Sequence, residues 1–341
     1  MIISFFGTYY VMPHSIRKLK ENDYLARDMY KLNTPLIPTN AGLIILFTSI
    51  LAVSINPLII RIINISHESY DFTGDYSQTN LALLLVVLIY GIYGFVDDLV
   101  DIGRKLKVVF PIAFSFPLAS VIYVDSINLG FLGNLNLSEE LINGVSFSDI
   151  FRITIVPVYV MVVANLVNMN SGYNGLQSGL SIIILSTISI KSFFDGKLEY
   201  ILPVASFLGA FLAFWFFNIF PAKIFEGNIG SLLFGSVIGS SIVIQNYWWF
   251  GFFILIPHTF NFLLWILWLV LMRVDPKSYL EENGLHSKFG TLTLEGTIIV
   301  PNRLTLKWIP NYYFKMTELH STLVLYILTS FFCISGLILF N

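Results

Sequence analysis

The chain has 341 residues, of which 56% are hydrophobic and 12% are charged, and its mean hydropathy is +0.76. Soluble domains carry about twice this charged fraction, so the composition excludes an ordinary soluble domain and indicates a polytopic membrane protein. The net charge of −2 gives no reason to expect a nucleic-acid partner. The single cysteine, Cys333, excludes an internal disulfide and provides no metal-ligand spacing.

Apolar segments recur along the chain, and a bilayer core of about 30 Å is crossed by about 20 mostly apolar residues. We therefore expect an all-α membrane bundle of about ten transmembrane helices, forming one domain over residues 1–341. Residues 273–318 are expected to be a long cytosolic loop within this domain. The predicted helices lie at about 1–16, 42–61, 81–97, 108–124, 151–168, 176–194, 200–220, from after Ser231 to 244, 247–272 and 319–340.

Two loops contain short segments typical of β-hairpins. INLGFLGNLNL lies in the acidic loop 125–149, where its Gly and Asn residues favour a tight turn. TLTLEGTIIV lies in the long loop 273–318 and alternates in the manner of a strand pair. We expect each to form a small appendage outside the helical bundle.

Lysine and arginine are unevenly distributed between the two sets of loops. The loops after the first, third, fifth, seventh and ninth helices hold 15 of the 19 basic residues. Since short basic loops stay in the cytosol, we expect this set of loops to be cytosolic. The polar motifs described below all lie in these loops, so an active site formed by them would face the cytosol.

Three carboxylates follow the third apolar segment in the stretch YGIYGFVDDLVDIGRKLK. If the helix continues for one more turn, Asp97, Asp98 and Asp101 share one face and repel one another unless a cation lies between them. Acidic groups at a helix C-terminus also oppose the helix dipole. With Lys107 close by, the pattern favours a site for Mg²⁺ or phosphate. The alternative is a solvated loop that is rich in charge.

Two loops are rich in asparagine and glycine. NLVNMNSGYNGLQSG (165–179) and FNIFPAKIFEGNIGS (217–231) each follow an apolar helix. Amide side chains are costly to bury without partners, so such a density favours contact with a polar ligand. Asparagine oxygens coordinate Mg²⁺, and glycines allow backbone N–H groups to approach phosphate. The alternative is that both are ordinary turns, which also favour these residues.

The four stretches GFVDDLVDIGRKLKVVFP, NLVNMNSGYNGLQSG, FNIFPAKIFEGNIGS and PHTFNF occur in this order over most of the chain. Together they resemble the signature loops of the polyprenyl-phosphate N-acetylhexosamine-1-phosphate transferases. Ser171 and Asn174 stand where the bacterial branch has aspartates. The chain therefore resembles more closely the eukaryotic and archaeal UDP-GlcNAc–dolichyl-phosphate GlcNAc-1-phosphate transferases. This resemblance implies a cytosolic active site beside a lipid groove and the cofactor Mg²⁺.

The resemblance also implies roles for individual residues. Asp97 and Asp98 match the paired catalytic aspartates, and Lys107 matches a base that binds phosphate. Asp98, Asn168 and Asn228 are the implied metal ligands, with Asn228 standing where the family usually has a metal-binding aspartate. That replacement keeps an oxygen ligand and removes one negative charge. The residues expected to bind substrate are Lys31, Asn40, Asn165, Asn174, Asn218, Lys223, His286 and Lys288, the last two as ligands of the donor pyrophosphate.

The implied reaction transfers GlcNAc-1-phosphate from UDP-GlcNAc to a dolichyl or polyprenyl phosphate and releases UMP, the step that starts N-glycan assembly. The expected partners are these two substrates and the lipid bilayer, with a homodimer left open. One alternative is a related transferase with another UDP-N-acetylhexosamine. Another is a membrane transporter of a phosphorylated solute, but transporters place ionisable residues near mid-membrane. The compact chain favours an archaeal cell membrane over the endoplasmic reticulum.

Overall fold

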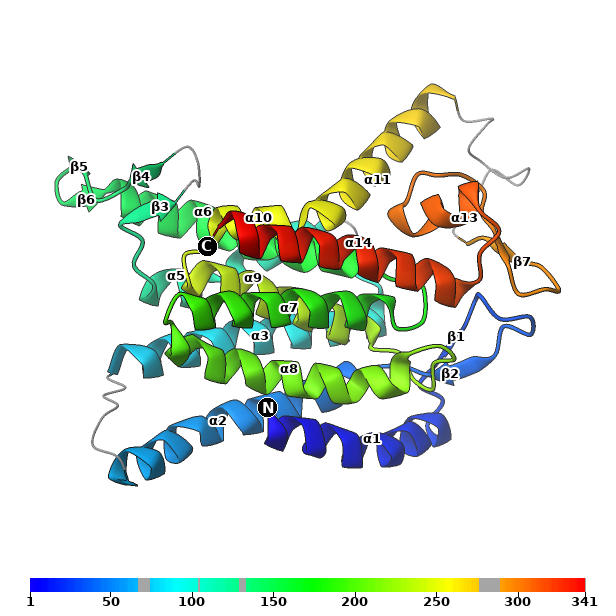
Figure 1. Cartoon of the computed structure of the whole chain (residues 1–341), viewed down its shortest axis with the longest axis horizontal. Coiled ribbons are helices and arrows are strands. Elements are labelled where there is room, and N and C mark those ends of the chain that lie inside the picture. The colour runs from blue at the N-terminus through cyan, green and yellow to red at the C-terminus, as the bar shows by residue number, and fades with distance from the viewer. Residues whose placement is uncertain (67–73, 104, 129–132, 276–288, 341) are drawn as a thin grey trace.

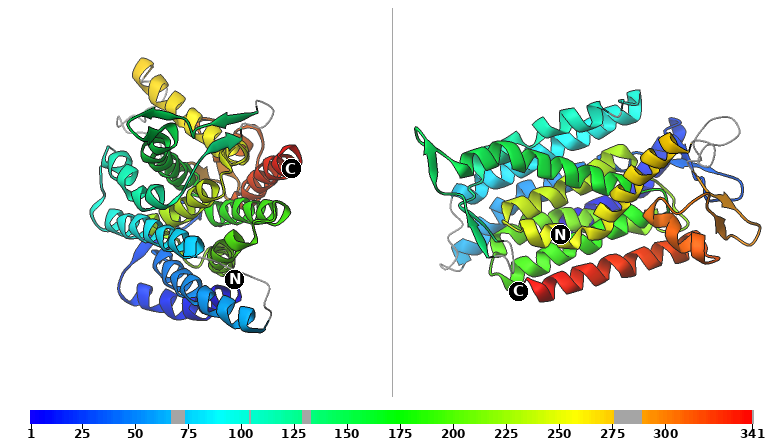
Figure 2. Two further views of the ribbon diagram at one scale, coloured as in Figure 1. Left: turned by 90° about the vertical axis from the view of Figure 1, so that its left-hand side faces the viewer. Right: turned by 90° about the horizontal axis from the view of Figure 1, so that it is seen from above.

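The computed structural model describes residues 1–66, 74–103, 105–128, 133–275 and 289–340. Long helices run side by side along the molecule, as Figure 1 and Figure 2 show from three directions. The helices are α1 (Ile2–Glu21), α2 (Gly42–Ser66), α3 (Gly74–Val100), α4 (Leu106–Phe114), α5 (Phe116–Val121), α6 (Phe147–Met169), α7 (Leu176–Phe194), α8 (Leu198–Asn218), α9 (Gly227–Ile244), α10 (Trp248–Ile254), α11 (Ile256–Val274), the 3₁₀ helix η2 (Leu306–Trp308), α13 (Ile309–Tyr313) and α14 (Glu318–Leu339).

The strands form small antiparallel pairs outside the bundle. Two of the pairs, β3–β4 and β7–β8, are the hairpins predicted from the sequence, and both predictions are confirmed. The pairs are β1 (Leu25–Arg27) with β2 (Leu36–Pro38), β3 (Ser126–Asn128) with β4 (Asn134–Asn136), β5 (Glu140–Ile142) with β6 (Val145–Ser146), and β7 (Thr291–Leu292) with β8 (Ile298–Ile299).

Two predicted helices are each broken into two. The segment predicted at 108–124 forms α4 and α5 with a break at Ser115, and the segment predicted at 247–272 forms α10 and α11 with a break at Leu255. In each case the second helix has a proline in its first turn, Pro117 or Pro257. Proline lacks an amide hydrogen and its ring clashes with the preceding turn, so it starts a new helix more readily than it continues one.

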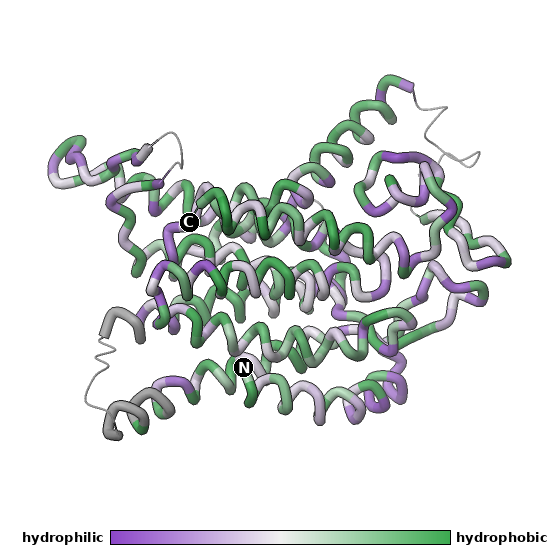
Figure 3. The backbone as a smooth tube through the Cα atoms, in the orientation of Figure 1, coloured by the Kyte–Doolittle hydropathy of each residue, from purple (hydrophilic) through white to green (hydrophobic). Residues whose placement is uncertain are grey.

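Seven helices in the described ranges are long and apolar enough to cross a membrane, fewer than the ten expected. Two further apolar stretches, Gly42–Leu58 and Leu106–Val121, are shorter. Helix α1 also ends in a basic segment, with Lys18 and Lys20 in its last turn. Figure 3 shows hydrophobic residues along the helices and hydrophilic residues gathered at the ends of the bundle. The chain is therefore a mostly helical, multi-pass membrane protein.

Helix α9 lies at the centre of the bundle, with 83% of its span buried. It packs most extensively against α3 and α6. Small residues allow these close approaches: a Cβ on Gly235 would lie 2.5 Å from Ala164 Cα of α6, and one on Gly94 of α3 would lie 2.7 Å from Ile229 Cα. Contacts between small residues drive helix association in membranes, where the hydrophobic effect between helices is weak.

Replacement of Gly42 by alanine is expected to destabilise the protein. Gly42 begins α2, and a Cβ there would lie 2.6 Å from Gly230 Cα, so the backbone of α2 or α9 must move. Overpacking of this kind costs about 1–3 kcal/mol. Thermal unfolding in detergent should show a lower Tm for Gly42→Ala. The matched control is Gly103→Ala, because a Cβ there would have no atom of the described residues within 4 Å apart from its chain neighbours. Equal Tm values for the two variants would contradict the predicted helix contact.

The loop between α1 and α2 and the loop between α8 and α9 are joined by backbone hydrogen bonds. Phe225 N donates to Pro38 O (2.9 Å), Ala41 N donates to Phe225 O (3.1 Å) and Gly42 N donates to Glu226 O (3.0 Å). These bonds hold two loops, far apart in the sequence, at the same end of the bundle. The predicted polar motifs lie at this end.

Candidate functional site

A cavity of about 300 Å³ opens among the loops at this end of the bundle. Its walls come from the α1–α2 loop, the end of α3, the α6–α7 loop, the α8–α9 loop and Phe289. The polar side chains around it include those of Asp98, Asn168, Gln177, Asn228 and Ser231. The structure thus brings together the three side chains predicted as metal ligands.

Asp98 is held by the N-terminus of α9. Its Oδ1 accepts a hydrogen bond from Asn228 N (3.1 Å), and its Oδ2 accepts one from Ile229 N (3.3 Å). A helix N-terminus favours negative charge, so α9 compensates for the unfavourable position of Asp98 near the C-terminus of α3. Gly227 allows this approach: its φ is +70°, and a Cβ there would lie 2.8 Å from Asp98 Oδ2. The carboxylate therefore has a fixed orientation at the cavity.

Asp97 has a different environment from Asp98. Its carboxylate is buried, and its Oδ2 lies 2.9 Å from Lys107 Nζ, while its Oδ1 accepts a hydrogen bond from Ile102 N (2.9 Å). Helix α3 ends at Val100, and Asp101 has φ +47°, so the helix does not continue through the three aspartates. Asp101 instead turns into solvent, 3.7 Å from Lys107 Nζ. The paired aspartates thus divide their contacts, with Asp97 binding Lys107 and Asp98 lining the cavity.

The predicted asparagines in α6 separate into two groups. Asn168 lines the cavity. Asn165, one turn earlier, donates from Nδ2 to Met161 O of its own helix (3.0 Å) and lies outside the cavity lining. Asn40 is buried beside Gly227, and among the described residues its Oδ1 has no hydrogen-bond partner. Asn40 therefore offers an acceptor next to Asp98, whereas Asn165 does not face the site.

Asn174 and Asn218 connect loops to one another. Asn174 Oδ1 accepts hydrogen bonds from Lys31 Nζ (3.0 Å) and Ala222 N (2.9 Å). Asn218 accepts from Ser178 Oγ (2.7 Å) and donates to Ile224 O (3.0 Å). Both amides are buried, so their hydrogen bonds fix the α6–α7 and α8–α9 loops that surround the cavity.

Lys31 is enclosed by opposite charges. Its Nζ lies 3.1 Å from Asp28 Oδ2 and 2.5 Å from Glu318 Oε2, and it stands over the ring of Phe220, 4.4 Å from the centroid. These contacts tie the α1–α2 loop to the start of α14. Lys223, by contrast, is exposed. Neither lysine is among the residues that line the cavity.

Lys307, near the cavity, was not predicted from the sequence, whereas Glu226 belongs to the predicted stretch 217–231 and lines the cavity. Lys307 Nζ donates to Ser171 O (2.8 Å), and burial lowers the pKa of this lysine to about 8. Burial raises the pKa of Glu226 to about 7, and Glu226 Oε2 accepts from Asn218 Nδ2 (3.2 Å). The available signal for Lys307 was its position between the apolar residues Leu306 and Trp308. The predicted His286 and Lys288 lie outside the described residues.

The ligand atoms that Asp98, Asn168 and Asn228 can supply are of the type that a magnesium ion binds. Magnesium takes oxygen ligands, and all three side chains supply oxygens to one cavity. Only one of the three is a carboxylate. No group of three or more His, Cys, Asp or Glu residues suited to a metal occurs within the described ranges. These residues therefore suit a hard cation, with a single negative charge to attract it.

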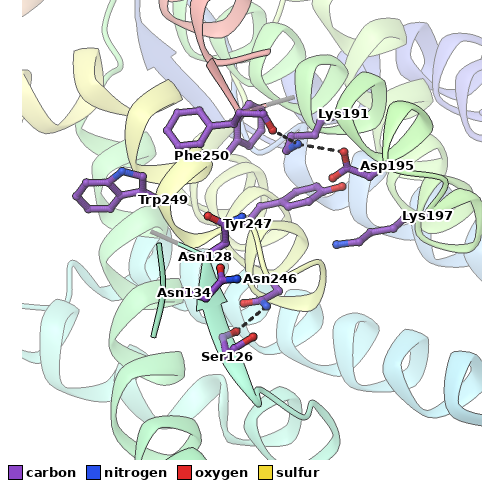
Figure 4. Close-up of a pocket in the computed structure, with 11 residues that line it drawn as sticks. Ser126, Asn128, Asn134, Lys191, Asp195, Lys197, Asn246, Tyr247, Trp249 and Phe250 are labelled. Carbon is purple, nitrogen blue, oxygen red and sulfur yellow. Dashed lines mark hydrogen bonds and ion pairs between the residues drawn. The ribbon is translucent and has the colours of Figure 1, made fainter. Parts of the chain in front are cut away.

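A second cavity, of about 310 Å³, lies at the other end of α7 (Figure 4). Its two lysines bind the C-terminal carbonyls of neighbouring helices. Lys191 Nζ donates to Phe340 O (2.7 Å) after α14 and lies 3.1 Å from Asp195 Oδ1, and Lys197 Nζ donates to Gln245 O (2.6 Å) after α9. Cations at helix C-termini stabilise the helix dipole, so these lysines have a structural role. The cavity that contains Asp98 is therefore the candidate active site.

Three known proteins that are similar to this chain are all named as transferases. Residues 80–246 match the family described as glycosyl transferase family 4. A provisionally named UDP-N-acetylglucosamine–dolichyl-phosphate N-acetylglucosaminephosphotransferase of Sulfolobus acidocaldarius is 29% identical, over 77% of this chain and 76% of its own. A provisionally named glycosyltransferase of Methanocaldococcus jannaschii is 25% identical, over 92% and 86%. The phospho-N-acetylmuramoyl-pentapeptide-transferase of Streptococcus mutans is 29% identical, over 72% of each chain.

Proposed function

Because this chain belongs to the polyprenyl-phosphate N-acetylhexosamine-1-phosphate transferase family, we propose that it transfers GlcNAc-1-phosphate from UDP-GlcNAc to a dolichyl or polyprenyl phosphate. UMP is the second product, and the lipid-linked pyrophosphoryl sugar would start N-glycan assembly. The names of the archaeal relatives from Sulfolobus acidocaldarius and Saccharolobus solfataricus support this donor and acceptor. We place the protein in an archaeal cell membrane with this site facing the cytosol.

One observation carries the proposal. The cavity joins a fixed carboxylate, Asp98, to two amide oxygens, and it does so at the end of membrane helices. Residues next to the carboxylate, including Val96, Leu99 and Val100, expose large apolar side chains. Exposed apolar side chains at the end of a membrane helix are suited to contact with lipid. A phosphate on a polyprenyl chain can therefore approach from the bilayer while a soluble nucleotide enters through the loops.

The reaction is a displacement at phosphorus. An oxygen of the lipid phosphate forms a bond to the β-phosphorus of the donor, and the bond from that phosphorus to the bridging oxygen breaks, so that UMP leaves with the electron pair. A magnesium ion held by Asp98, Asn168 and Asn228 would, when bound, neutralise charge on the donor diphosphate. The amide hydrogens of Asn228 and Ile229 hold the Asp98 carboxylate in a fixed orientation. Asp97 holds Lys107 in an ion pair at the end of α3.

The direct test is UMP release by the purified protein. With Mg²⁺, dolichyl phosphate and UDP-GlcNAc, we expect UMP to form only when all three are present. Parallel reactions with other UDP-N-acetylhexosamines identify a related donor. Folded protein that releases no UMP from any of these donors would overturn the proposal, and uptake of a phosphorylated sugar by proteoliposomes would then indicate a transporter.

A further inference from the structure

Positive charge on the side of the bundle opposite the candidate active site gathers in one cavity. Of the 19 basic residues, 15 lie in the loops expected to be cytosolic, and two of the remaining four, Lys191 and Lys197, line the cavity at the far end of α7. Since the non-cytosolic side of a membrane protein carries few basic residues, two lysines in one cavity there indicate a local need for positive charge.

The two ammonium groups lie over the same aromatic ring. Lys191 Nζ is 5.1 Å and Lys197 Nζ is 4.4 Å from the centroid of the Tyr247 ring, and Figure 4 shows both lysines around this side chain. Tyr247 is buried, and the face of an aromatic ring attracts cations. Two positive charges held this close together repel each other unless an anion lies near both.

The protein neutralises only one of the two lysines. The charged residues that line the cavity are Lys191, Lys197 and Asp195, which leaves one net positive charge. Asp195 Oδ1 lies 3.1 Å from Lys191 Nζ. Lys197 forms no ion pair with a carboxylate of the described residues, Asp195 and the neighbouring Glu199 included. Its hydrogen bond to Gln245 O uses one of three ammonium hydrogens, so Lys197 keeps donors for an anion in the cavity.

Neutral amides complete the polar lining. Asn246 Nδ2 donates to Ser126 O (2.8 Å), and this bond holds the β3–β4 hairpin against the turn between α9 and α10. An amide nitrogen has two hydrogens, so one remains for a further oxygen. Asn128 and Asn134 of the hairpin also line the cavity. The cavity therefore combines cations with amide groups, which suits the several oxygens of a phosphate ester.

The rim of this cavity is apolar and aromatic. Phe193 and Phe194, at the end of α7, are exposed. Trp249 lines the cavity and stacks on the exposed ring of Phe252, with ring centroids 5.5 Å apart. Aromatic side chains concentrate where membrane helices meet the headgroup region of the bilayer. A ligand with a phosphate at one end and apolar chains at the other can therefore contact the lysines and this rim together.

We propose that this cavity binds the phosphate group of an anionic lipid in the leaflet opposite the candidate active site, with Lys191 and Lys197 as its cationic ligands. Basic pockets between membrane helices bind anionic lipid headgroups in this way. A soluble phosphate ester shares the same chemistry, and the aromatic rim favours the lipid. The site is separate from the transfer reaction, because α7 and α9 cross the whole bundle between the two cavities.

The test measures lipid affinity by native mass spectrometry on the full-length protein in detergent. The probes are phosphatidylglycerol, a diacylglycerol with the same chains and no phosphate, and glycerol 3-phosphate. We expect Lys197→Gln to bind phosphatidylglycerol about tenfold more weakly than the parent, and Lys197→Arg to retain most of the affinity. The glutamine amide can still donate to Gln245 O, so the fold should survive. Diacylglycerol affinity should not change.

The matched control is Arg152→Gln. Arg152 is a basic residue in the first turns of α6, at the same end of the bundle, and its Nη1 already lies 3.3 Å from Asp149 Oδ1. Unchanged phosphatidylglycerol affinity in Lys197→Gln, or an equal loss in Arg152→Gln, would overturn the proposal. If glycerol 3-phosphate binds as tightly as the lipid and is lost in Lys197→Gln, the phosphate site is supported and its lipid source is overturned.

Hydrogen exchange on the parent needs no variant and so remains available if Lys197→Gln does not fold. Phosphatidylglycerol should slow amide exchange in the turn that contains Asn246 and Tyr247 severalfold, whereas the diacylglycerol should not. Exchange in the loops around Asp98 should be the same with either lipid. Equal exchange in the turn with the two lipids would contradict a phosphate site at this end of the bundle.

Discussion

Asp98→Asn is expected to lower lipid-dependent UMP release by at least about 10²-fold with little change in stability. The substitution removes the only negative charge among Asp98, Asn168 and Asn228, and so weakens the attraction for a cation at the donor phosphates. The fold should survive because an asparagine oxygen can still accept a hydrogen bond from Asn228 N or Ile229 N, as Asp98 does now. Initial rates at saturating UDP-GlcNAc, together with Tm, measure the two effects.

The matched control for this experiment is Asp101→Asn. Asp101 is three residues further along the chain, its side chain is fully exposed, and it lies 3.7 Å from Lys107 Nζ. It carries the same charge into the same region of the protein without contact with α9. A similar loss of rate in both variants would mean that general electrostatic potential, and not the position of the Asp98 carboxylate, governs the reaction.

Lys31→Met is expected to cost about 3–5 kcal/mol of stability, the largest effect we predict on folding. Its side chain is 19% exposed, and its partners Glu318 and Asp28 are 2% and 4% exposed. Removal of the cation leaves two carboxylates buried near each other, without the charge that compensated them. Chemical unfolding in detergent, followed by tryptophan fluorescence, measures the loss.

Two further variants test whether the loss of stability comes from the unpaired buried carboxylates or from the removal of any lysine. Lys18 forms a pair of similar length with Glu21, 2.7 Å, in which the side chains are 55% and 50% exposed. Exposed pairs contribute about 0–1 kcal/mol, so Lys18→Met should be close to neutral. Adding Glu318→Gln to Lys31→Met should recover part of the stability. If Lys31→Met and Lys18→Met have the same stability, the buried pair does not hold the α1–α2 loop to α14.

The sequence determined the helical elements and most of their boundaries. The predicted helix 176–194 coincides with α7, and α6 and α14 begin and end within a few residues of their predicted limits. A membrane helix must satisfy its backbone hydrogen bonds internally and present apolar side chains to lipid. The length of an uninterrupted apolar run therefore predicts the length of the helix. The breaks at Ser115 and Leu255 were harder to predict because proline is tolerated in many membrane helices, where neighbouring helices satisfy the freed backbone groups.

The sequence also identified the loops that form the candidate site, and it placed Asp98, Asn168 and Asn228 in one group. The tertiary structure decided which residues of these loops line the cavity and which make other contacts. Adjacent aspartates differ by about 100° around a helix, so one can be buried against Lys107 while the other meets α9. Asn165 and Asn168 are also in one helix, but only Asn168 reaches the cavity. Local spacing cannot show which neighbour occupies each direction.

Only the tertiary structure showed the contacts across the chain that define the site. Lys31 and Glu318 are separated by 287 positions, and Lys307 and Ser171 by 136. The identity of such partners depends on how the loops between membrane helices fold over one another, which no periodic pattern encodes. Composition and apolar runs therefore determine that this protein crosses a membrane and which end of it is polar. The packing of five loops at that end determines which charges are neutralised within the protein and which remain for a ligand.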